Sequence, residues 1–475
     1  MIIGYLICSL LLATALFFNK NKTVNNCLVG VFIALQWVLT VFMYSNKDLS
    51  DTSYFLPDAL AIILLFTLSI ISIPVLTHSY DYIYKEKDTP SSKGAYFGAS
   101  VVLISALTAA YLSSHIAVTW IFIEITTLGS SILIFHRRNA GSIEATWKYI
   151  FSSSISLIFV FIGILFLSIA IGKSGEESLQ YLALIKLAPK LDPFWLKLSF
   201  VFVFTGYTLK LGLVPLYTAG IDAKDKAPTP SGAMFSTVMM NAGFVGVYRF
   251  YSIVAQTSVH KWANVVILIS AFLSIFVAAV YMLKVRNIKR MLAYSGIEHS
   301  GLIMLGLAAG GIGYYAALLH IVLHSFAKSS LFLQIGHLYK TYQSKNIYDI
   351  GDYFKYNRAG AVFLMIAFVC VTAMPPSGLF ISEFFIFKSL FEAKYLYILI
   401  PVLILLTFIL WALGRSIMRM LFTPPINMNE GKIEKTSVYE TVTQYVLLGI
   451  VFYLGLNPPT VFVDLINEAI KYLIH

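Results

Sequence analysis

The sequence predicts an all-α, polytopic membrane protein of about 14 transmembrane helices, and three observations indicate this class. The 475 residues are 58% hydrophobic and only 12% charged, with a mean hydropathy of +0.80. A soluble domain carries about a quarter charged residues. The apolar runs are about 20 residues long, which suits a spanning helix, and they lack the alternation expected of barrel strands.

Each expected span is an apolar run bounded by polar or turn-forming residues. In order, the spans are 1–18, 26–45, 57–84, 94–112, 115–136, 149–171, 196–220, 230–254, 262–285, 290–311, 314–340, 359–392, 395–422 and 438–456. The first has no basic residue before it and no evident cleavage site, so it is expected to be a retained helix. Segment 172–195 is too polar to span, and 457–475 is typical of an interfacial helix.

The net charge of +11 has a simple explanation in a membrane protein. Loops that follow odd-numbered spans are rich in Lys and Arg, as in the "KVRNIKR" segment after the ninth span, whereas the other loops are poorer in cations. Cytoplasmic loops carry such an excess. The pattern therefore predicts a cell (inner) membrane protein with both termini outside, and a nucleic-acid partner is not expected.

Composition and motifs exclude several kinds of site. The three cysteines, Cys8, Cys27 and Cys370, are scattered, which argues against disulfides, an iron–sulfur cluster or a zinc site in this chain. No Gly-rich nucleotide motif in strand context and no nucleophile–base spacing is present. No catalytic centre and no cofactor are therefore expected.

Two spans contain helix breakers at mid-length. The seventh carries Lys210 and Pro215, and the twelfth carries Pro375 and Pro376 followed by Glu383. Proline removes a backbone donor, and in lipid such a break survives only where protein or a water-filled cavity satisfies the freed groups. Two broken spans five apart are typical of an internal repeat of five-helix units and indicate a transport pathway.

The repeat predicts four segments. They are an N-terminal three-helix segment at 1–93, a first five-helix repeat at 94–254 broken near 210–220, a second at 262–422 broken near 374–380, and a final helix with its tail at 423–475.

Ionisable residues within spans are expensive and usually face a partner or a cavity. Glu124 lies deep in the fifth span and Lys210 deep in the seventh, so the two are expected to form an ion pair. A purely structural pair is the alternative.

The eleventh span has the strongest pattern, with His320, His324 and Lys328 every four residues on one helix face. No carboxylate or cysteine accompanies them at ligand spacing, so no metal is expected. Histidine changes charge near neutral pH, which favours a proton relay over simple helix–helix contacts.

Two further groups extend this hypothesis. Glu298 and His299 in the tenth span either belong to the relay or line an entrance, and Glu383 is expected on the pathway. Taken together, Glu124, Lys210, Lys328 and Glu383 would pass a proton along as the pKa values of neighbouring groups shift in turn.

Four motifs carry a resemblance to a known family. The runs "KLGLVPLYTAGIDAKDKAPTPSGAMFSTVMMNAGFVGVYRF", "IKRMLAYSGIEHSGL", "HIVLHSFAKSSLFL" and "MPPSGLFISEFFIF" occur in this order within roughly 94–420. The chain resembles the proton-translocating antiporter-like subunits of complex I, Mrp antiporters and membrane-bound hydrogenases, and most of all the hydrogenase-4 component F branch.

The resemblance implies two inverted five-helix repeats, each with a broken helix. It also implies relay positions in the fifth, seventh and twelfth spans, which are Glu124, Lys210 and Glu383 here. Asn241 replaces the family's usual lysine in the eighth span, so the relay would pass through Lys328 and its histidines. Tyr217 stands where a histidine is familiar.

The implied function is that of a proton- or cation-translocating subunit without a redox centre. The resemblance implies a complex I-like oxidoreductase of the hydrogenase type, with other membrane subunits and with hydrogenase-like and iron–sulfur partners. An Mrp-type Na⁺/H⁺ antiporter subunit, a subunit of quinone-linked NADH dehydrogenase and a non-conducting scaffold are the alternatives. Both H⁺ and Na⁺ fit the sequence as the transported ion.

Overall fold

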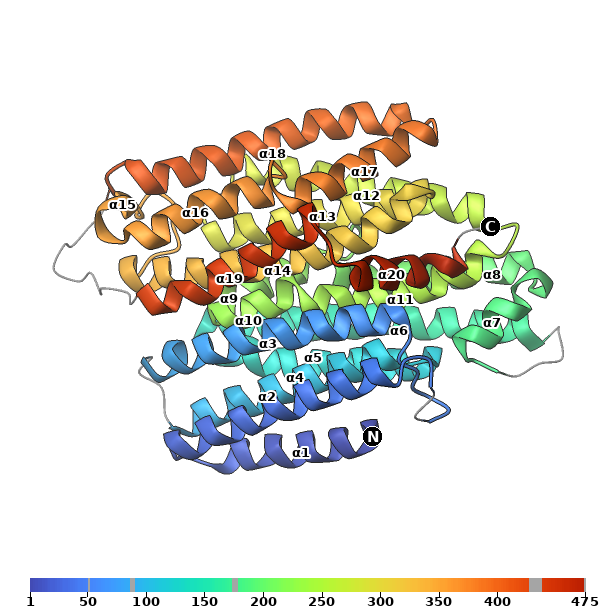
Figure 1. Ribbon diagram of the computed structural model, residues 1–475, viewed down its shortest axis with the longest axis horizontal. Coiled ribbons are helices and arrows are strands. Elements are labelled where there is room, and N and C mark those ends of the chain that lie inside the picture. The colour runs from blue at the N-terminus through green and yellow to red at the C-terminus, as the bar shows by residue number, and fades with distance from the viewer. Residues whose placement is uncertain (50–51, 86–89, 173–177, 427–437, 474–475) are drawn as a thin grey trace.

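The computed structural model describes every residue except 50–51, 86–89, 173–177, 427–437 and 474–475, and the described part is all-helical (Figure 1). The predicted last segment, 423–475, therefore includes residues outside the described ranges. The helices are α1 Ile2–Phe18, α2 Lys22–Ser45, α3 Ala59–Lys85, α4 Pro90–Leu112, α5 Ile116–Phe135, α6 Ala140–Gly172, α7 Tyr181–Leu187, α8 Pro193–Leu211, α9 Thr218–Lys226, α10 Thr229–Ser236, α11 Val238–Ala255, α12 His260–Met282, α13 Ile288–Ala309, α14 Ile312–Tyr342, α15 Tyr353–Tyr356, α16 Arg358–Val371, α17 Gly378–Glu392, α18 Leu396–Phe422, α19 Val438–Leu456 and α20 Thr460–Ala469. Short 3₁₀ turns, Ala188–Lys190 and Ile470–Tyr472, follow α7 and α20.

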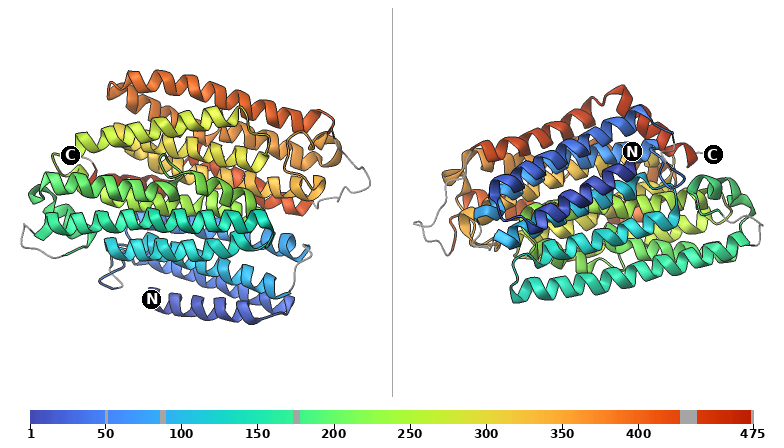
Figure 2. Two further views of the ribbon diagram at one scale, coloured as in Figure 1. Left: turned by 180° about the vertical axis from the view of Figure 1, so that it is seen from behind. Right: turned by 90° about the horizontal axis from the view of Figure 1, so that it is seen from below.

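The long helices run nearly parallel to one another in all three views (Figures 1 and 2). Chain order crosses the molecule from α1 at one edge to α18 at the other (Figure 1). The last helices then return, and α19 and α20 pack against α14 and α3. This return places α14 in the middle of the bundle, where most of its side chains are buried.

Ten described helices are long and apolar enough to cross a membrane, or eleven if the bent α19–α20 pair is one span. The predicted number is higher because α1, α13 and the α16–α17 pair do not meet this standard. The α13 helix carries Glu298 and His299 at mid-length, which lowers its hydropathy. The α16 and α17 helices, with 14 and 15 residues, are each too short.

The expected break in the seventh span is present. The α8 helix ends at Leu211, Gly212 adopts a left-handed φ of 80°, and α9 begins at Thr218 after Pro215. Serines of α12 satisfy the freed backbone, because the Val214 N–H donates to Ser274 Oγ at 2.9 Å and Ser270 Oγ donates to the Val214 carbonyl. The break is thus held by protein, as a buried break requires.

The twelfth span is also broken, between Val371 of α16 and Gly378 of α17, a segment that contains Pro375 and Pro376. Ser377 caps α17 by accepting from the Phe380 N–H at 3.3 Å. Gly378 lies against α19 so closely that an added Cβ would lie 2.3 Å from the Val451 carbonyl oxygen.

A third discontinuity separates α10 from α11 at Thr237, inside the expected eighth span. Thr237 has φ −129° and ψ −90°, outside the helical region. The single span expected at 230–254 is confirmed, since 229–255 is long and apolar enough to cross a membrane, and the sequence gives no Gly or Pro signal for the irregularity within it.

The C-terminal tail folds back onto the bundle. The α20 helix turns by 73° from α19. Glu468 forms an ion pair with Lys47, and the Tyr248 hydroxyl donates to the Ala469 carbonyl at 2.8 Å. The tail therefore ties the end of the chain to the loop after α2.

Candidate functional site

Three helices meet in the second half of the molecule around a buried set of ionisable side chains. All of the set are at most 7% exposed: Glu298 and His299 on α13, His320, His324 and Lys328 on α14, and Glu383 on α17. The four-residue spacing on α14 presents His320, His324 and Lys328 to one side, as predicted. The α17 helix contributes because its break allows Glu383 to approach α13.

Polar contacts connect Lys328 to Glu383 in four steps. Lys328 Nζ donates to Ser295 Oγ at 2.7 Å, and Ser295 Oγ donates to Glu298 Oε2 at 3.4 Å. Glu298 Oε2 lies 3.7 Å from His299 Nε2, and His299 Nδ1 lies 4.0 Å from Glu383 Oε1. We call this path the Lys328–Glu383 chain. Its two longer steps are of the length that one bridging water or a small side-chain rotation closes.

The other two histidines branch from this chain. His299 Nδ1 and His320 Nε2 share a hydrogen bond of 3.0 Å, and His320 Nδ1 lies 2.9 Å from Ser382 Oγ. The His324 ring lies 4.8 Å from the His299 ring, and neither of its nitrogens has a hydrogen-bond partner among the described residues. The sequence placed Glu298 and His299 either in the relay or at an entrance, and they lie within the chain of contacts.

The same groups also resemble a metal donor set. The nearest ligand atoms of His299, His320 and Glu383 lie within 4.8 Å of one another. Spacing along one helix could not reveal this grouping, because the tertiary structure brings donors from three helices together. The 3.0 Å contact between two imidazole nitrogens is a hydrogen bond, in which one ring donates a proton to the other.

The first half of the molecule holds Lys210, buried at the end of α8. Its Nζ donates to Thr127 Oγ1 at 2.9 Å and to the Tyr149 hydroxyl at 2.8 Å. The predicted ion pair with Glu124 is not present within 4.0 Å. Glu124 lies one turn before Thr127 on α5, and its Oε2 is buried without a hydrogen-bond partner. The hydroxyl groups of Thr127 and Tyr149 take the place of the expected carboxylate, because both accept hydrogen bonds from the Lys210 ammonium.

Asn241 and Lys224, a lysine that the sequence patterns did not single out, lie between the first and second halves of the molecule. The Asn241 amide donates to Ser325 Oγ of α14 at 3.0 Å, one residue after His324. Lys224 of α9 is buried, and its Nζ lies 3.7 Å from where a Cβ on Gly296 of α13 would be. Sequence patterns did not single out Lys224; its position just after the broken span was the available signal. Within the described ranges, the side-chain hydrogen bonds that start at Lys210 lead to Thr127, Tyr149 and Met239 and do not reach Lys328, so the expected line of four groups falls into two parts.

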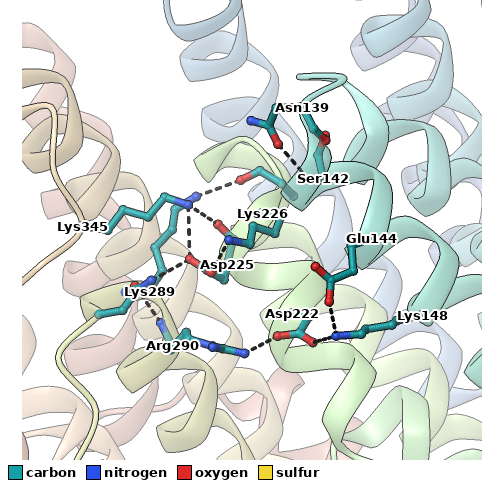
Figure 3. Close-up of polar contacts among 12 residues, drawn as sticks. Asn139, Ser142, Glu144, Lys148, Asp222, Asp225, Lys226, Lys289, Arg290 and Lys345 are labelled. Carbon is teal, nitrogen blue, oxygen red and sulfur yellow. Dashed lines mark hydrogen bonds and ion pairs between the residues drawn. The ribbon is translucent and has the colours of Figure 1, made fainter.

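A second charged cluster lies at the end of the bundle, around the acidic residues of α9 (Figure 3). We call it the Asp222–Asp225 cluster. Asp225 accepts from Lys345 at 3.2 Å and from Asn287 at 2.9 Å, and Asp222 forms an ion pair with Arg290. Burial lowers the pKa of the Lys345 ammonium, and the attraction of Asp225 opposes that shift. The cluster fastens α9 to α13 and to the segment after α14.

Comparison with known proteins gives the family. Residues 113–409 match the model described as NADH:quinone oxidoreductase/Mrp antiporter, TM, which is more than half of the chain. The chain therefore belongs to this family. It is an ion-translocating, antiporter-type membrane subunit that crosses the membrane several times.

Individual relatives agree with this assignment. The chain is 28% identical over 380 residues to a hydrogenase-4 component F homolog of Methylacidiphilum infernorum, with 78% of this chain and 80% of the relative covered. It is 26% identical to NADH-quinone oxidoreductase subunit N of Hydrogenovibrio crunogenus, with 84% and 82% covered. A chain of the archaeal membrane-bound sulfane sulfur reductase shares the fold, with a TM-score of 0.87, 20% identity, and 99% and 96% covered. Such relatives are subunits of multi-subunit membrane complexes.

Proposed function

We propose that this chain moves protons, and that the Lys328–Glu383 chain is the part of the route that crosses the second half of the protein. The observation that supports this proposal most strongly is the series of closely spaced exchangeable groups from α14 through α13 to α17, with two hydrogen bonds of 2.7 and 3.4 Å followed by two gaps of 3.7 and 4.0 Å. Buried ionisable groups in a membrane usually serve such a pathway because they are costly.

The contacts suggest how a proton advances. Lys328 is solvated by a neutral hydroxyl, and its nearest carboxylate, Glu298, lies one hydroxyl further on. When Glu298 takes up a proton, Lys328 loses a compensating negative charge and releases its own proton more readily. His299 then connects Glu298 to Glu383 through its two nitrogens. The hydrogen bond of His320 to Ser382 holds the branch imidazole in orientation.

A cavity supports Glu383 as the outer end of this route. A space of about 220 Å³ is lined by Glu298 and Glu383 and by residues of α18, among them Leu403 and Thr407. Both of these α18 residues are exposed at the molecular surface. The carboxylates at the end of the chain thus face a cavity that reaches the outside of the isolated subunit.

The donor chemistry favours a proton over Na⁺. Imidazole nitrogens, an ammonium and hydroxyl groups make up most of the chain, and a bare cation is coordinated by oxygen ligands. The side-chain oxygens that contact these groups come from Glu298, Glu383, Ser295 and Ser382.

The architecture we propose has fourteen spans. The α1 and α13 helices and the α16–α17 pair are added to the eleven apolar spans. We assign the two inverted five-helix repeats to 94–254 and 262–422, each with its broken helix, between the three-helix segment 1–93 and the end segment 423–475. Cation-rich loops would face the cytoplasm of a cell (inner) membrane, with both termini outside.

We further propose a complex of the membrane-bound hydrogenase type, with hydrogenase-like and iron–sulfur partners, because a hydrogenase-4 component F homolog is among the relatives. An Mrp-type antiporter complex and a quinone-linked NADH dehydrogenase are the second candidates, since the matching family includes both. Purification of the native assembly separates them. Hydrogenase-like and iron–sulfur subunits support the first, and only small membrane subunits support the Mrp type.

The test of proton movement is Lys210→Ala in the native complex reconstituted into vesicles. Lys210 is buried on its hydroxyl partners, so its loss should abolish coupled proton uptake while the complex remains assembled. The matched control is Lys197→Ala, an exposed lysine on the same helix, which should pump normally. Full pumping by Lys210→Ala would remove Lys210 from the route, and full pumping by both Lys210→Ala and Lys328→Met would overturn the proposal.

A further inference from the structure

A cavity of about 340 Å³ lies at one end of the bundle, between the end of α12, the segment that leads into α13, the loop after α14 and the last turns of α18. Its lining contains four cations and no acidic residue: Lys284, Arg286, Arg415 and Arg419. We call it the Arg415 pocket. The Lys328–Glu383 chain does not include any of its residues.

The cations of the Arg415 pocket have no carboxylate partner within the described part of the chain, whereas other cations close by do. None of the four forms an ion pair with a described residue. At the neighbouring Asp222–Asp225 cluster, by contrast, Arg290 and Lys345 each contact a carboxylate (Figure 3). Four adjacent unpaired cations repel one another, so the pocket is electrostatically incomplete without an anion.

Aromatic rings hold the guanidinium groups in place. Arg419 lies 4.4 Å and Arg286 5.6 Å from the centre of the Tyr348 ring, and Arg415 lies 5.3 Å from the Trp411 ring. The Arg419 Nε is buried and has no hydrogen-bond partner. Stacking fixes the planes of the groups and leaves their N–H edges available, which is the arrangement that recognises phosphate oxygens.

The surroundings point to a lipid as the source of the phosphate. The pocket opens between two apolar helix faces that are exposed in the isolated chain, with Val280 and Leu283 at the α12 side and Trp411 and Met418 on α18. Acyl chains would lie along these faces, as they do on other spanning helices.

We infer that the Arg415 pocket binds the phosphate of an anionic membrane phospholipid, with the acyl chains on α12 and α18. Basic pockets between spanning helices are known to suit such headgroups. The bound lipid would supply the negative charge that the described chain does not, and it would fasten the end of α18 to the loop after α14.

The test uses the native complex in vesicles that contain a photoactivatable phosphatidylglycerol or a photoactivatable phosphatidylcholine. Phosphatidylglycerol should label peptides 282–291 and 411–419 in preference to phosphatidylcholine. In Arg415→Gln/Arg419→Gln this labelling should fall about thirtyfold, the order expected for the loss of two cations near an anionic surface. The charge-preserving Arg415→Lys/Arg419→Lys should retain part of it.

A matched control distinguishes lipid binding in the Arg415 pocket from general electrostatic attraction between anionic lipid and the protein. Lys355→Gln/Arg358→Gln removes the same charge from exposed residues outside the pocket, so phosphatidylglycerol labelling should be unchanged. Equal loss in both double variants would overturn the inference.

Two other occupants would also overturn it. Inorganic phosphate that displaces the lipid label as effectively as unlabelled phosphatidylglycerol would identify a free-ion site. Absence of lipid labelling in the intact complex, together with cross-links from this pocket to an acidic segment of a neighbouring subunit, would identify a protein contact.

Discussion

The Lys328–Glu383 chain and the Asp222–Asp225 cluster use similar side chains in opposite ways. At the cluster, the carboxylates of Asp222 and Asp225 contact cations directly, with an Asp225–Lys345 distance of 3.2 Å. In the chain, no lysine touches a carboxylate: Lys328 donates to a serine. Lys210 in the first half likewise donates only to hydroxyls.

This difference separates charges that hold the fold from charges that move protons. A direct ion pair stabilises both ionised states and resists a change of protonation. A lysine whose ammonium donates only to a hydroxyl can release its proton more easily, because no ion-pair energy is lost with the proton. Substitutions in the two regions should therefore have opposite effects on transport and on stability.

The largest effect on transport is expected for Lys328→Met. Loss of a positioned proton-transfer group costs about 10²–10⁴-fold in rate, so pumping should fall to background. Thermal stability should change little, since Lys328 donates to the Ser295 hydroxyl and, among the described residues, forms no direct ion pair that the substitution would break. Proton uptake by vesicles and thermal melting of the complex test the two statements. A variant that pumps normally contradicts the assignment of the chain.

Asp225→Asn should show the opposite result. Lys345 would keep a partly buried charge without its carboxylate, which should lower the free energy of unfolding by about 2 kcal/mol. Proton uptake per assembled complex should remain within about twofold, because the residue lies outside the chain. Abundance, melting temperature and uptake are measured together. A stable complex that does not pump would place Asp225 in the route instead.

The pH dependence of the loss of stability in Asp225→Asn gives a sharper test of the comparison. Burial lowers the pKa of Lys345, so the unfolded chain binds more protons than the folded one below the ordinary lysine pKa of about 10.4, and this group's contribution to stability rises with pH. Without Asp225 the pKa of Lys345 falls further, so the loss of stability in Asp225→Asn should shrink as the pH rises toward the ordinary lysine pKa of about 10.4. The double variant Asp225→Asn/Lys345→Met lacks the titrating lysine. The difference between its free energy of unfolding and that of Lys345→Met should therefore not depend on pH over the same interval.

The smallest effect is expected for Glu144→Gln at the edge of the cluster. Glu144 and Lys148 form a 2.5 Å contact, but their side chains are 64% and 53% exposed. Water screens such pairs, so neither melting temperature nor proton uptake should change measurably. A clear loss of either would show that the cluster extends further across the surface than its buried contacts indicate.

Sequence patterns predicted several local features well. The apolar runs located the long helices, and the prolines located both broken spans, because each feature depends on neighbouring residues. The four-residue spacing placed His320, His324 and Lys328 on one face of α14. Thr237 was missed since its break has no Gly or Pro.

Contacts between helices were harder to predict. The Glu124–Lys210 ion pair was expected because opposite buried charges usually pair, yet Thr127 and Tyr149 take that place. Hydroxyl residues are common in every span, so no pattern singled out these two or Ser295. Lys224 was not singled out because the packing of α9 against α13 is not visible in the local sequence.

The sequence by itself determined the membrane class, the helices, their breaks and the identity of the costly buried charges, since burial in lipid and helix periodicity act over a few residues. Only the tertiary structure decided which groups touch. It bends α17 toward α13, joins Lys328 to Glu298 through a hydroxyl, and leaves the cations of the Arg415 pocket unpaired. These outcomes depend on distances between helices far apart in the chain, which no local pattern encodes.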